Sequence, residues 1–171
     1  MADLSPKSKN PPEGITVRHD VRPGDLGSLI GLHGVLYGRQ YGYDHTFEPY
    51  VARPMADFIL SESGRQRIWI VETGHEIAGC LAVVEASDEE AQLRWFLLSP
   101  QIRGRGVGRY LFEDALIFCR EAGYKRAFLL TVDLHTEAAA LYLSAGFVLT
   151  EEHPAELWGA VRTEQRYDIR L

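Results

Sequence analysis

The sequence has little of what holds very small or metal-dependent proteins together. Its 171 residues include two cysteines and no Cys-x-x-Cys pair. Cys80 and Cys119 lie inside apolar stretches, so we expect buried, reduced thiols and no metal site. No apolar run is long enough to cross a bilayer, and the N-terminus has no apolar core of a secretory signal. These absences argue against a disulfide-rich secreted protein or a membrane protein and favour the cytoplasm.

A surplus of positive charge is also missing. Lysine and arginine number 18 against 24 acidic residues, a formal net charge of −6. Nucleic-acid-binding proteins usually carry a basic face, so we expect no nucleic-acid partner. Hydrophobic residues make up 46% of the chain, which suits one globular domain of this length. An acidic surface weakly favours a cationic partner.

The pattern of apolar residues predicts one α/β domain over residues 15–171, after a Pro-, Ser- and Lys-containing disordered leader at residues 1–14. Asp25 is placed to cap the first helix. A loop containing His153, Pro154 and Trp158 is expected between the last two strands. The predicted strands are 15–19, 67–72, 76–86, 91–98, 127–132, 147–151 and 164–171, and the predicted helices are 25–36, 46–60, 107–122 and 136–145.

The most informative segment is the run Arg-Gly-Arg-Gly-Val-Gly from Arg103 to Gly108, followed by Arg109. It lies between an apolar strand and an amphipathic helix. Glycines let a backbone approach a ligand closely. The following helix presents unpaired N–H groups and the positive end of its dipole. The segment therefore suits an anion such as a diphosphate.

Other interpretations of this loop are weaker. A Walker-type loop needs Lys and then Ser or Thr after its last glycine, where this chain has Arg109 and Tyr110. A dinucleotide-binding fold places its glycine loop after the first strand, and here the loop follows the fourth. A tight connection with solvated arginines is the remaining structural alternative.

Two motifs together resemble the GCN5-related N-acetyltransferase (GNAT) superfamily. The first is the loop Arg103 to Gly108, which fits the family's Arg/Gln-x-x-Gly-x-Gly/Ala pattern after its fourth strand. The second is His135-Thr-Glu-Ala-Ala-Ala-Leu-Tyr142 followed by Gly146-Phe147, which is similar to the family's Asn-x-x-Ala-x-x-Leu-Tyr and Gly-Phe signature. The resemblance covers residues 15–171. It implies a single-domain fold with a mixed, mostly antiparallel sheet of about seven strands and about four flanking helices.

A narrower resemblance concerns residues 36–48, Leu-Tyr-Gly-Arg-Gln-Tyr-Gly-Tyr-Asp-His-Thr-Phe-Glu. This segment looks like the acetyltransferase domain fused behind MarR-type winged helices in bacteria. No winged-helix region precedes it here, so the resemblance implies a free-standing version.

The resemblance implies acetyl-CoA as the acyl donor, with no metal. The backbone of the strand before the loop would pair with pantetheine, and the loop amides would hold the diphosphate. Arg103 would order the loop or reach a phosphate oxygen. His135 stands where the family often has Asn. The implied cofactor-binding residues are Phe96, Leu97, Leu98, Arg103, Gly104, Arg105, Gly106, Val107, Gly108, Arg109 and His135.

For the chemistry, the resemblance places Tyr142 beside the thioester sulfur, where its phenol would protonate the departing thiolate. No cysteine lies near the motifs, so direct attack in a ternary complex is favoured over an acyl-enzyme. The general base is open. The family's two glutamate positions correspond to Gln92 and Leu130 in this chain, and neither side chain can act as a base.

Candidate substitutes for the base are Glu48, His45, Glu72, Glu85 and ordered water. Glu48 is preferred, because residues 36–48 combine aromatic side chains with Asp44, His45 and Glu48, a set that suits an amine with an apolar body. His153 and Trp158 are expected to close over the acceptor.

The expected function is acetyl transfer to the primary amine of a small molecule or a peptide. A sensor that binds acyl-CoA without turnover is the alternative. A homodimer is compatible with the sequence.

Overall fold

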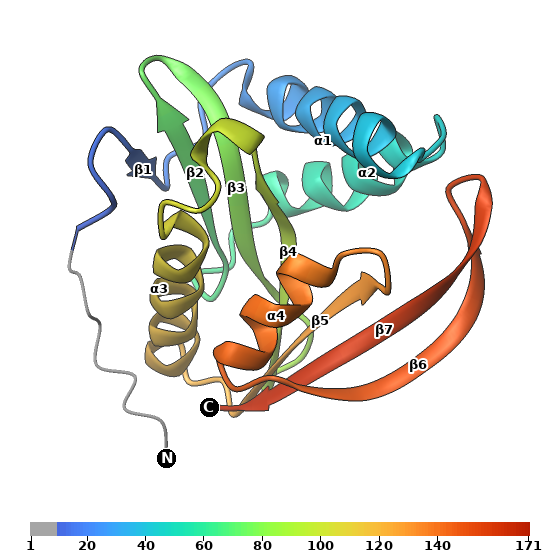
Figure 1. The fold of residues 1–171 in the computed structure, drawn as a ribbon. Coiled ribbons are helices and arrows are strands. Elements are labelled where there is room, and N and C mark those ends of the chain that lie inside the picture. Colours follow the sequence, from blue (N-terminus) through green and yellow to red (C-terminus); the bar gives the residue numbers. More distant parts are fainter. Residues whose placement is uncertain (1–9) are drawn as a thin grey trace.

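A seven-stranded sheet organises the protein, and the computed structural model describes residues 10–171 (Figure 1). Its order is β1-β2-β3-β4-β5-β7-β6, with every pair antiparallel except the parallel pair β4–β5. The strands are β1 (Thr16–Arg18), β2 (Arg67–Thr73), β3 (Glu76–Glu85), β4 (Glu90–Leu98), β5 (Arg126–Val132), β6 (Val148–Leu157) and β7 (Ala160–Arg170). The predicted mixed, mostly antiparallel sheet is confirmed.

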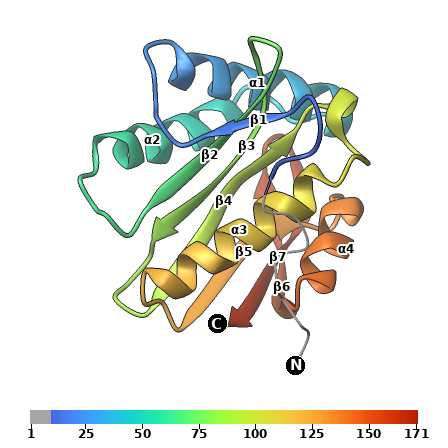
Figure 2. The same cartoon turned by 90° about the vertical axis from the view of Figure 1, so that its left-hand side faces the viewer.

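Four α-helices cover the two faces of the sheet in pairs (Figure 2). They are α1 (Asp25–Tyr41), α2 (Phe47–Leu60), α3 (Val107–Glu121) and α4 (Thr136–Ser144), and a short 3₁₀ helix, η1 (Pro100–Ile102), precedes the glycine loop. One core packs α3 and α4 on one face, through residues such as Leu111 and Tyr142. A second core packs α1 and α2 on the other, through residues such as Leu29 and Met55. The predicted element order is confirmed.

The parallel strands β4 and β5 separate along their length. They pair only from Glu90 to Gln92 on β4 and from Arg126 to Phe128 on β5. Beyond those residues β4 continues to Leu98 and β5 to Val132 without pairing with each other. The gap opens toward the glycine loop, and it positions the site.

A bulge in β4 changes which side chains share a face. The register between β3 and β4 shifts between Cys80 and Ala82, and Trp95 has a φ of 55°, an unusual value for a bulky residue. Leu93 belongs to the α3 core, and normal alternation would place Trp95 with it. Instead Trp95 belongs to the α1–α2 core, while Phe96 packs against the α3 core. The bulge thus places Phe96 on the side of the glycine loop.

One prediction about the chain's end is wrong. Residues 152–163 form no loop, because β6 and β7 run as one long, curved hairpin whose turn contains Trp158 and Gly159 (Figure 1). Most of β6 is exposed on both faces, so it shows no apolar alternation. It is also the edge strand, where the missing N–H of Pro154 leaves no ladder bond broken within the sheet.

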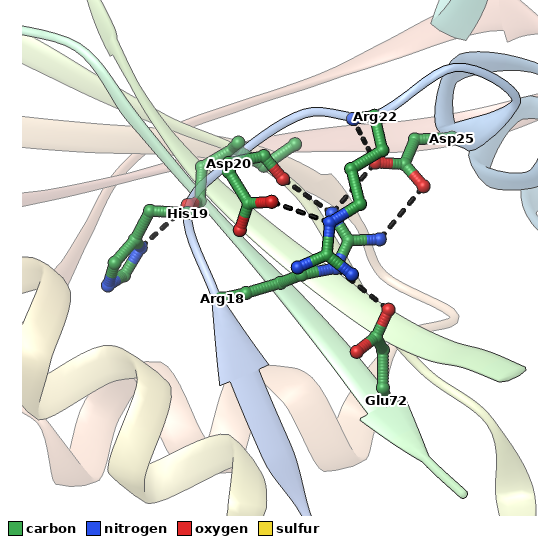
Figure 3. A network of polar contacts seen from close by, with 7 residues as sticks. Arg18, His19, Asp20, Arg22, Asp25 and Glu72 are labelled. Carbon is green, nitrogen blue, oxygen red and sulfur yellow. Dashed lines mark hydrogen bonds and ion pairs between the residues drawn. The ribbon is translucent and has the colours of Figure 1, made fainter. Parts of the chain in front are cut away.

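A buried ion network ties β1, α1 and β2 together (Figure 3). Arg18 donates two hydrogen bonds of 2.8 Å to the carboxylate of Asp25 and one of 2.7 Å to Glu72. Asp25 was expected to cap α1 with its side chain, but Gly24 is the N-cap residue and makes no side-chain bond. The Asp25 carboxylate instead binds Arg18 and the N–H of Arg22, which fixes where α1 begins.

Residues 1–9 of the predicted leader lie outside the described residues. Residues 10–14 are placed against the domain, because Arg105 Nη2 donates a 2.6 Å hydrogen bond to the carbonyl of Glu13.

Candidate active site

A cavity of about 410 Å³ lies where β4, the glycine loop, α1 and α4 meet. This volume falls within the range of small-molecule sites. Nine of the eleven predicted cofactor residues line it: Phe96, Leu97, Leu98, Arg103, Gly104, Gly106, Gly108, Arg109 and His135. Tyr142 also lines it. Segments separated by 46 positions in the sequence, from Phe96 to Tyr142, are thus brought together.

The glycine loop has the geometry of an anion-binding turn. Gly104 and Gly106 have φ values of 70° and 83°, which side chains disfavour. Gly106 is the N-cap of α3 and makes no side-chain bond, and the first backbone bond of the helix runs from Tyr110 N–H to the carbonyl of Gly106. The preceding N–H groups of the first turn, Val107 to Arg109, therefore have no partner within the helix. They can bind a diphosphate at the positive end of the helix.

Gly108 is required for a different reason, because α3 approaches β4 and α4 closely here. A Cβ at this position would lie 3.2 Å from both Phe96 Cζ and Leu141 Cδ2. A larger residue would push the helix N-terminus away from the strand.

The loop arginines have different roles. Arg103 donates from Nε to the carbonyl of Leu98 at 2.8 Å and from Nη2 to Gln40 at 3.0 Å, so it orders the loop. Arg109 lines the cavity and brings a positive charge. Arg105 does not line it, since its guanidinium binds the carbonyl of Glu13. Val107 is buried in the core, and only its backbone can serve the ligand.

The edge of β4 next to the gap offers free backbone groups. Ser99 N–H bonds Ala78 of β3, so by alternation the groups of Leu98 and Phe96 point the other way. Two side chains confirm this direction. Arg103 donates a hydrogen bond to the carbonyl of Leu98, and Tyr37 Oη donates one of 3.2 Å to the carbonyl of Phe96. The N–H groups of Phe96 and Leu98 face the gap left by β5 and can pair with an extended ligand.

A second, smaller cavity of about 90 Å³ lies on the other side of the gap. Its walls come from α1, α2, β4, β5 and the turn between β6 and β7. Four residues line both cavities: Tyr37, Phe96, His135 and Tyr142. These four side chains mark the place where the contents of the two cavities can meet.

Tyr142 is held firmly at this junction. Its side chain is 6% exposed, and its ring lies 5.3 Å from that of Phe112 and 5.7 Å from that of Tyr167. Burial raises the pKa of the Tyr142 phenol well above its ordinary value. The hydroxyl therefore stays protonated at neutral pH and can act as a proton donor.

His135 is fixed through both ring nitrogens. Nε2 lies 2.8 Å from Tyr43 Oη and Nδ1 lies 3.1 Å from Thr131 Oγ1. Burial lowers the pKa of His135 to about 4, with a smaller contribution from the charge of Arg162. The imidazole is thus neutral at pH 7. It is a weak base, and with both ring nitrogens engaged it lines the cavity without a free donor or acceptor of its own.

The structure does not bring the preferred base to the site. Glu48 is exposed and lines neither cavity, because its carboxylate lies over Gly34 of α1, within 2.0 Å of where a Cβ would be. His45 is exposed outside both cavities. Glu72 pairs with Arg18, and Glu85 pairs with Arg65 at 2.8 Å.

The two positions that match the family's glutamates do reach the smaller cavity. Gln92 and Leu130 both line it. Trp158 lines it as well, packed 4.6 Å from the ring of Tyr43 and 4.8 Å from that of Phe47. His153 does not, because it lies on β6 beside Glu164 at 3.5 Å.

The lining residues of the smaller cavity that sequence reasoning missed include His33, Arg94 and Trp95. His33 is 2% exposed inside an amphipathic helix, where it resembles any core residue. The β4 bulge places Arg94 and Trp95 together, and the sequence pattern does not predict this bulge.

Comparisons with known proteins identify the family. A model described as "Acetyltransferase (GNAT) family" matches residues 35–147, from within α1 to just past α4. This chain belongs to the GNAT family of acetyltransferases. The two motifs that suggested the family lie within the matched region.

Solved structures of GNAT proteins share the fold. An acetyltransferase from Streptococcus agalactiae superposes with a TM-score of 0.75 at 21% identity, covering 93% of this chain and 99% of that one. The spermidine N-acetyltransferase from Vibrio cholerae, in complex with CoA and spermine, gives 0.70 at 20% identity, covering 92% and 95%. A GNAT acetyltransferase from Elizabethkingia anophelis with acetyl-CoA bound gives 0.63 at 17% identity, covering 93% and 99%.

Curated relatives include N-acetyltransferases of rat and mouse. N-acetyltransferase 8B of Rattus norvegicus is 35% identical over 108 residues, which is 60% of this chain and 48% of the relative. N-acetyltransferase 8 of Mus musculus is 34% identical over 89 residues, 49% and 39% respectively. The chain therefore spans about half the length, or less, of the curated relatives it matches.

Two further observations concern residues 10–171. No helix in this range is long and apolar enough to cross a membrane. Within the same range, no group of three or more His, Cys, Asp or Glu side chains is arranged to hold a metal ion.

Proposed function

We propose that this protein transfers the acetyl group of acetyl-CoA to a primary amine, by direct attack within a ternary complex. The observation that carries the proposal is the meeting of two cavities at Tyr37, Phe96, His135 and Tyr142. The larger one has a helix N-terminus for a diphosphate and a free strand edge for pantetheine. The smaller one has aromatic walls for an acceptor. Family membership supports the same chemistry.

Acetyl-CoA would lie along the gap between β4 and β5. Its diphosphate would accept hydrogen bonds from the amides between Gly104 and Arg109, and its pantetheine amides would pair with Phe96 and Leu98. The thioester would then reach the junction. There a backbone N–H of β4 would polarise the thioester carbonyl as an oxyanion hole does, a contribution worth on the order of 3 kcal/mol for a single donor.

The amine nitrogen would attack the carbonyl carbon from the smaller cavity, and the C–S bond would break as the tetrahedral intermediate collapses. Tyr142 would donate its proton to the departing thiolate, and burial keeps the phenol protonated at neutral pH before that step. No Asp or Glu among residues 10–171 lines the smaller cavity, so ordered water would carry the amine proton to solvent.

An assay of acetyl-CoA turnover tests the proposal. Purified protein is incubated with acetyl-CoA and a panel of primary amines, and free CoA and acetylated amine are measured together. The proposal predicts their appearance in equal amounts. Tight acetyl-CoA binding without turnover of any amine would favour the alternative, an acyl-CoA sensor. The polar but non-basic Gln92 at a family base position keeps that alternative open to test.

A further inference from the structure

The smaller cavity has a charge pattern opposite to that of a site for polycationic amines. No acidic side chain among residues 10–171 lines it, and Arg94 is the one lining residue that is charged at neutral pH. Its two histidines, His33 and His135, are neutral, because burial lowers the pKa of each to about 4. A second ammonium group in the acceptor would find no counter-charge there.

Arg94 has no anionic partner among residues 10–171. It is half-buried, yet it makes no hydrogen bond or ion pair with any described residue. Its guanidinium lies 5.3 Å from the centre of the Trp95 ring, a cation–π contact. Arg18, Arg65 and Arg166 have carboxylate partners. Arg162 bonds two backbone carbonyls, and Arg67 lies over the Phe118 ring. The guanidinium of Arg94 therefore keeps its fork of donors for a ligand.

A second donor stands next to it. Trp95 is 8% exposed, and its indole N–H is buried without a partner among residues 10–171. The β4 bulge places this side chain beside Arg94, where regular alternation would send the two to opposite faces. A planar guanidinium and a neighbouring N–H donor together suit a carboxylate.

The opposite wall offers an acceptor. His33 Nδ1 lies 2.8 Å from the carbonyl of Leu29, which can only accept, so Nδ1 carries the proton. Nε2 is left with a lone pair and has no partner in the described part of the chain. His33 stacks on Tyr37, one of the four residues at the junction, with ring centroids 6.0 Å apart. An amine N–H near the junction is a fitting donor for this lone pair.

We infer that the acceptor is an amine that also carries a carboxylate, an amino acid or a close analogue with an apolar body. Its carboxylate binds Arg94 and Trp95, its apolar part packs on Phe47, Tyr50 and Trp158, and its nitrogen faces the thioester. This inference deepens the proposed function and rests on it. Arg94 also helps the chemistry, because a nearby positive charge and an apolar site both lower the pKa of a bound ammonium and favour the neutral nucleophile.

The test compares amines that differ only by the carboxylate: alanine with ethylamine, leucine with 3-methylbutylamine, and phenylalanine with 2-phenylethylamine. At saturating acetyl-CoA, the wild-type kcat/KM of the acid should exceed that of its partner by about tenfold or more in at least one pair. Arg94→Gln should erase that ratio. Arg120→Gln, which removes an exposed arginine from α3, should retain it. A wild-type ratio of one or below in every pair, or a ratio unchanged by Arg94→Gln, overturns the inference.

A binding measurement separates this inference from the proposed function. The N-acetyl product of each amine is titrated into the protein saturated with CoA. The carboxylate-bearing product should bind about tenfold or more tightly than its decarboxylated partner, and the difference should vanish in Arg94→Gln. If that holds while no amine is turned over, the proposed catalysis fails and the recognition stands. Equal binding of both products in wild type rejects the recognition, whether or not turnover occurs.

Discussion

Single side chains at the junction of the two cavities carry the proposed chemistry. Tyr142 is buried and protonated there, and His135 is neutral and held by Tyr43 and Thr131. Burial lowers the pKa of His135 and raises that of Tyr142, which reinforces the protonated state that any phenol has at neutral pH, since desolvation disfavours the charged form of each group. A phenol that cannot ionise at neutral pH is a donor throughout the working range.

Replacing Tyr142 by Phe should lower kcat by about 10²- to 10⁴-fold, the usual contribution of a general acid. The ring packing against Phe112 is retained, so acetyl-CoA affinity and the free energy of unfolding should change little. Timed assays of CoA release measure kcat, and calorimetry measures acetyl-CoA affinity and the free energy of unfolding. A turnover number within about twofold of wild type would show that the hydroxyl serves no rate-limiting step.

Glu48 should be dispensable. Its carboxylate lies against Gly34 and outside both cavities, so Glu48→Gln should leave kcat and KM for the best amine within about twofold of wild type. Steady-state kinetics at several pH values give the answer. A strong loss of kcat with an altered pH profile would show that Glu48 acts as the general base.

His33 makes stability depend on pH. Its pKa in the folded protein is about 4 against 6.5 for a free imidazole, so the unfolded chain binds more protons between those values. Stability from this group is therefore present near pH 7 and is lost as the pH falls toward 4, by about 2 kcal/mol between pH 7 and pH 5. Denaturant unfolding of wild type and His33→Asn at both pH values isolates this share. An equal pH dependence in the two proteins would contradict it.

Whole elements explain where these side chains lie. The separation of β4 and β5 opens the gap. The bulge at Trp95 turns Phe96 to the face of the glycine loop, where it borders both cavities, while Arg94 and Trp95 line only the smaller one. The β6–β7 hairpin brings Trp158 across the molecule to the aromatic side chains of α1 and α2. The acceptor side is thus built from tertiary contacts.

The ion network at the start of α1 should matter for stability and not for the cofactor. Asp25→Ala leaves the guanidinium of Arg18, 8% exposed, with one carboxylate fewer, and should cost about 3 kcal/mol of unfolding free energy. Asp20→Ala is the matched control, because the exposed Asp20–Arg22 pair should contribute less than about 1 kcal/mol. Denaturant midpoints compare the two variants. Equal, small losses would show that burial adds nothing to the network.

Sequence reasoning succeeded where a pattern is local. The glycine loop, the helix after it and the Leu-Tyr and Gly-Phe signature are contiguous, so their places in the fold followed directly. It failed where long-range packing decides. The exposed strand β6 has no alternation of apolar and polar residues. The position of Glu48 depends on how α1 packs on α2, and that of Arg94 depends on the bulge that shifts the register between β3 and β4.

In the molecule as a whole, the proposed function uses the N-terminal end of α3 for the diphosphate and the smaller cavity for the acceptor, on either side of the gap between β4 and β5. The family match covers the C-terminal part of α1 and continues from α2 to α4. The acetyl donor is thus the better supported half of the proposal. The acceptor rests on side chains that this chain supplies itself, Arg94 above all.

The most direct test is calorimetric titration of acetyl-CoA into two glycine variants of α3. Gly106 and Gly123 lie at opposite ends of the helix with φ values of 83° and 84°, and a Cβ at either would touch nothing within 4 Å. Alanine at each should therefore add a similar backbone strain, about 1–2 kcal/mol. The account predicts that Gly106→Ala weakens acetyl-CoA binding about tenfold or more, because its loop presents the diphosphate amides, and that Gly123→Ala binds like wild type. Equal affinity in both variants would contradict binding at this loop.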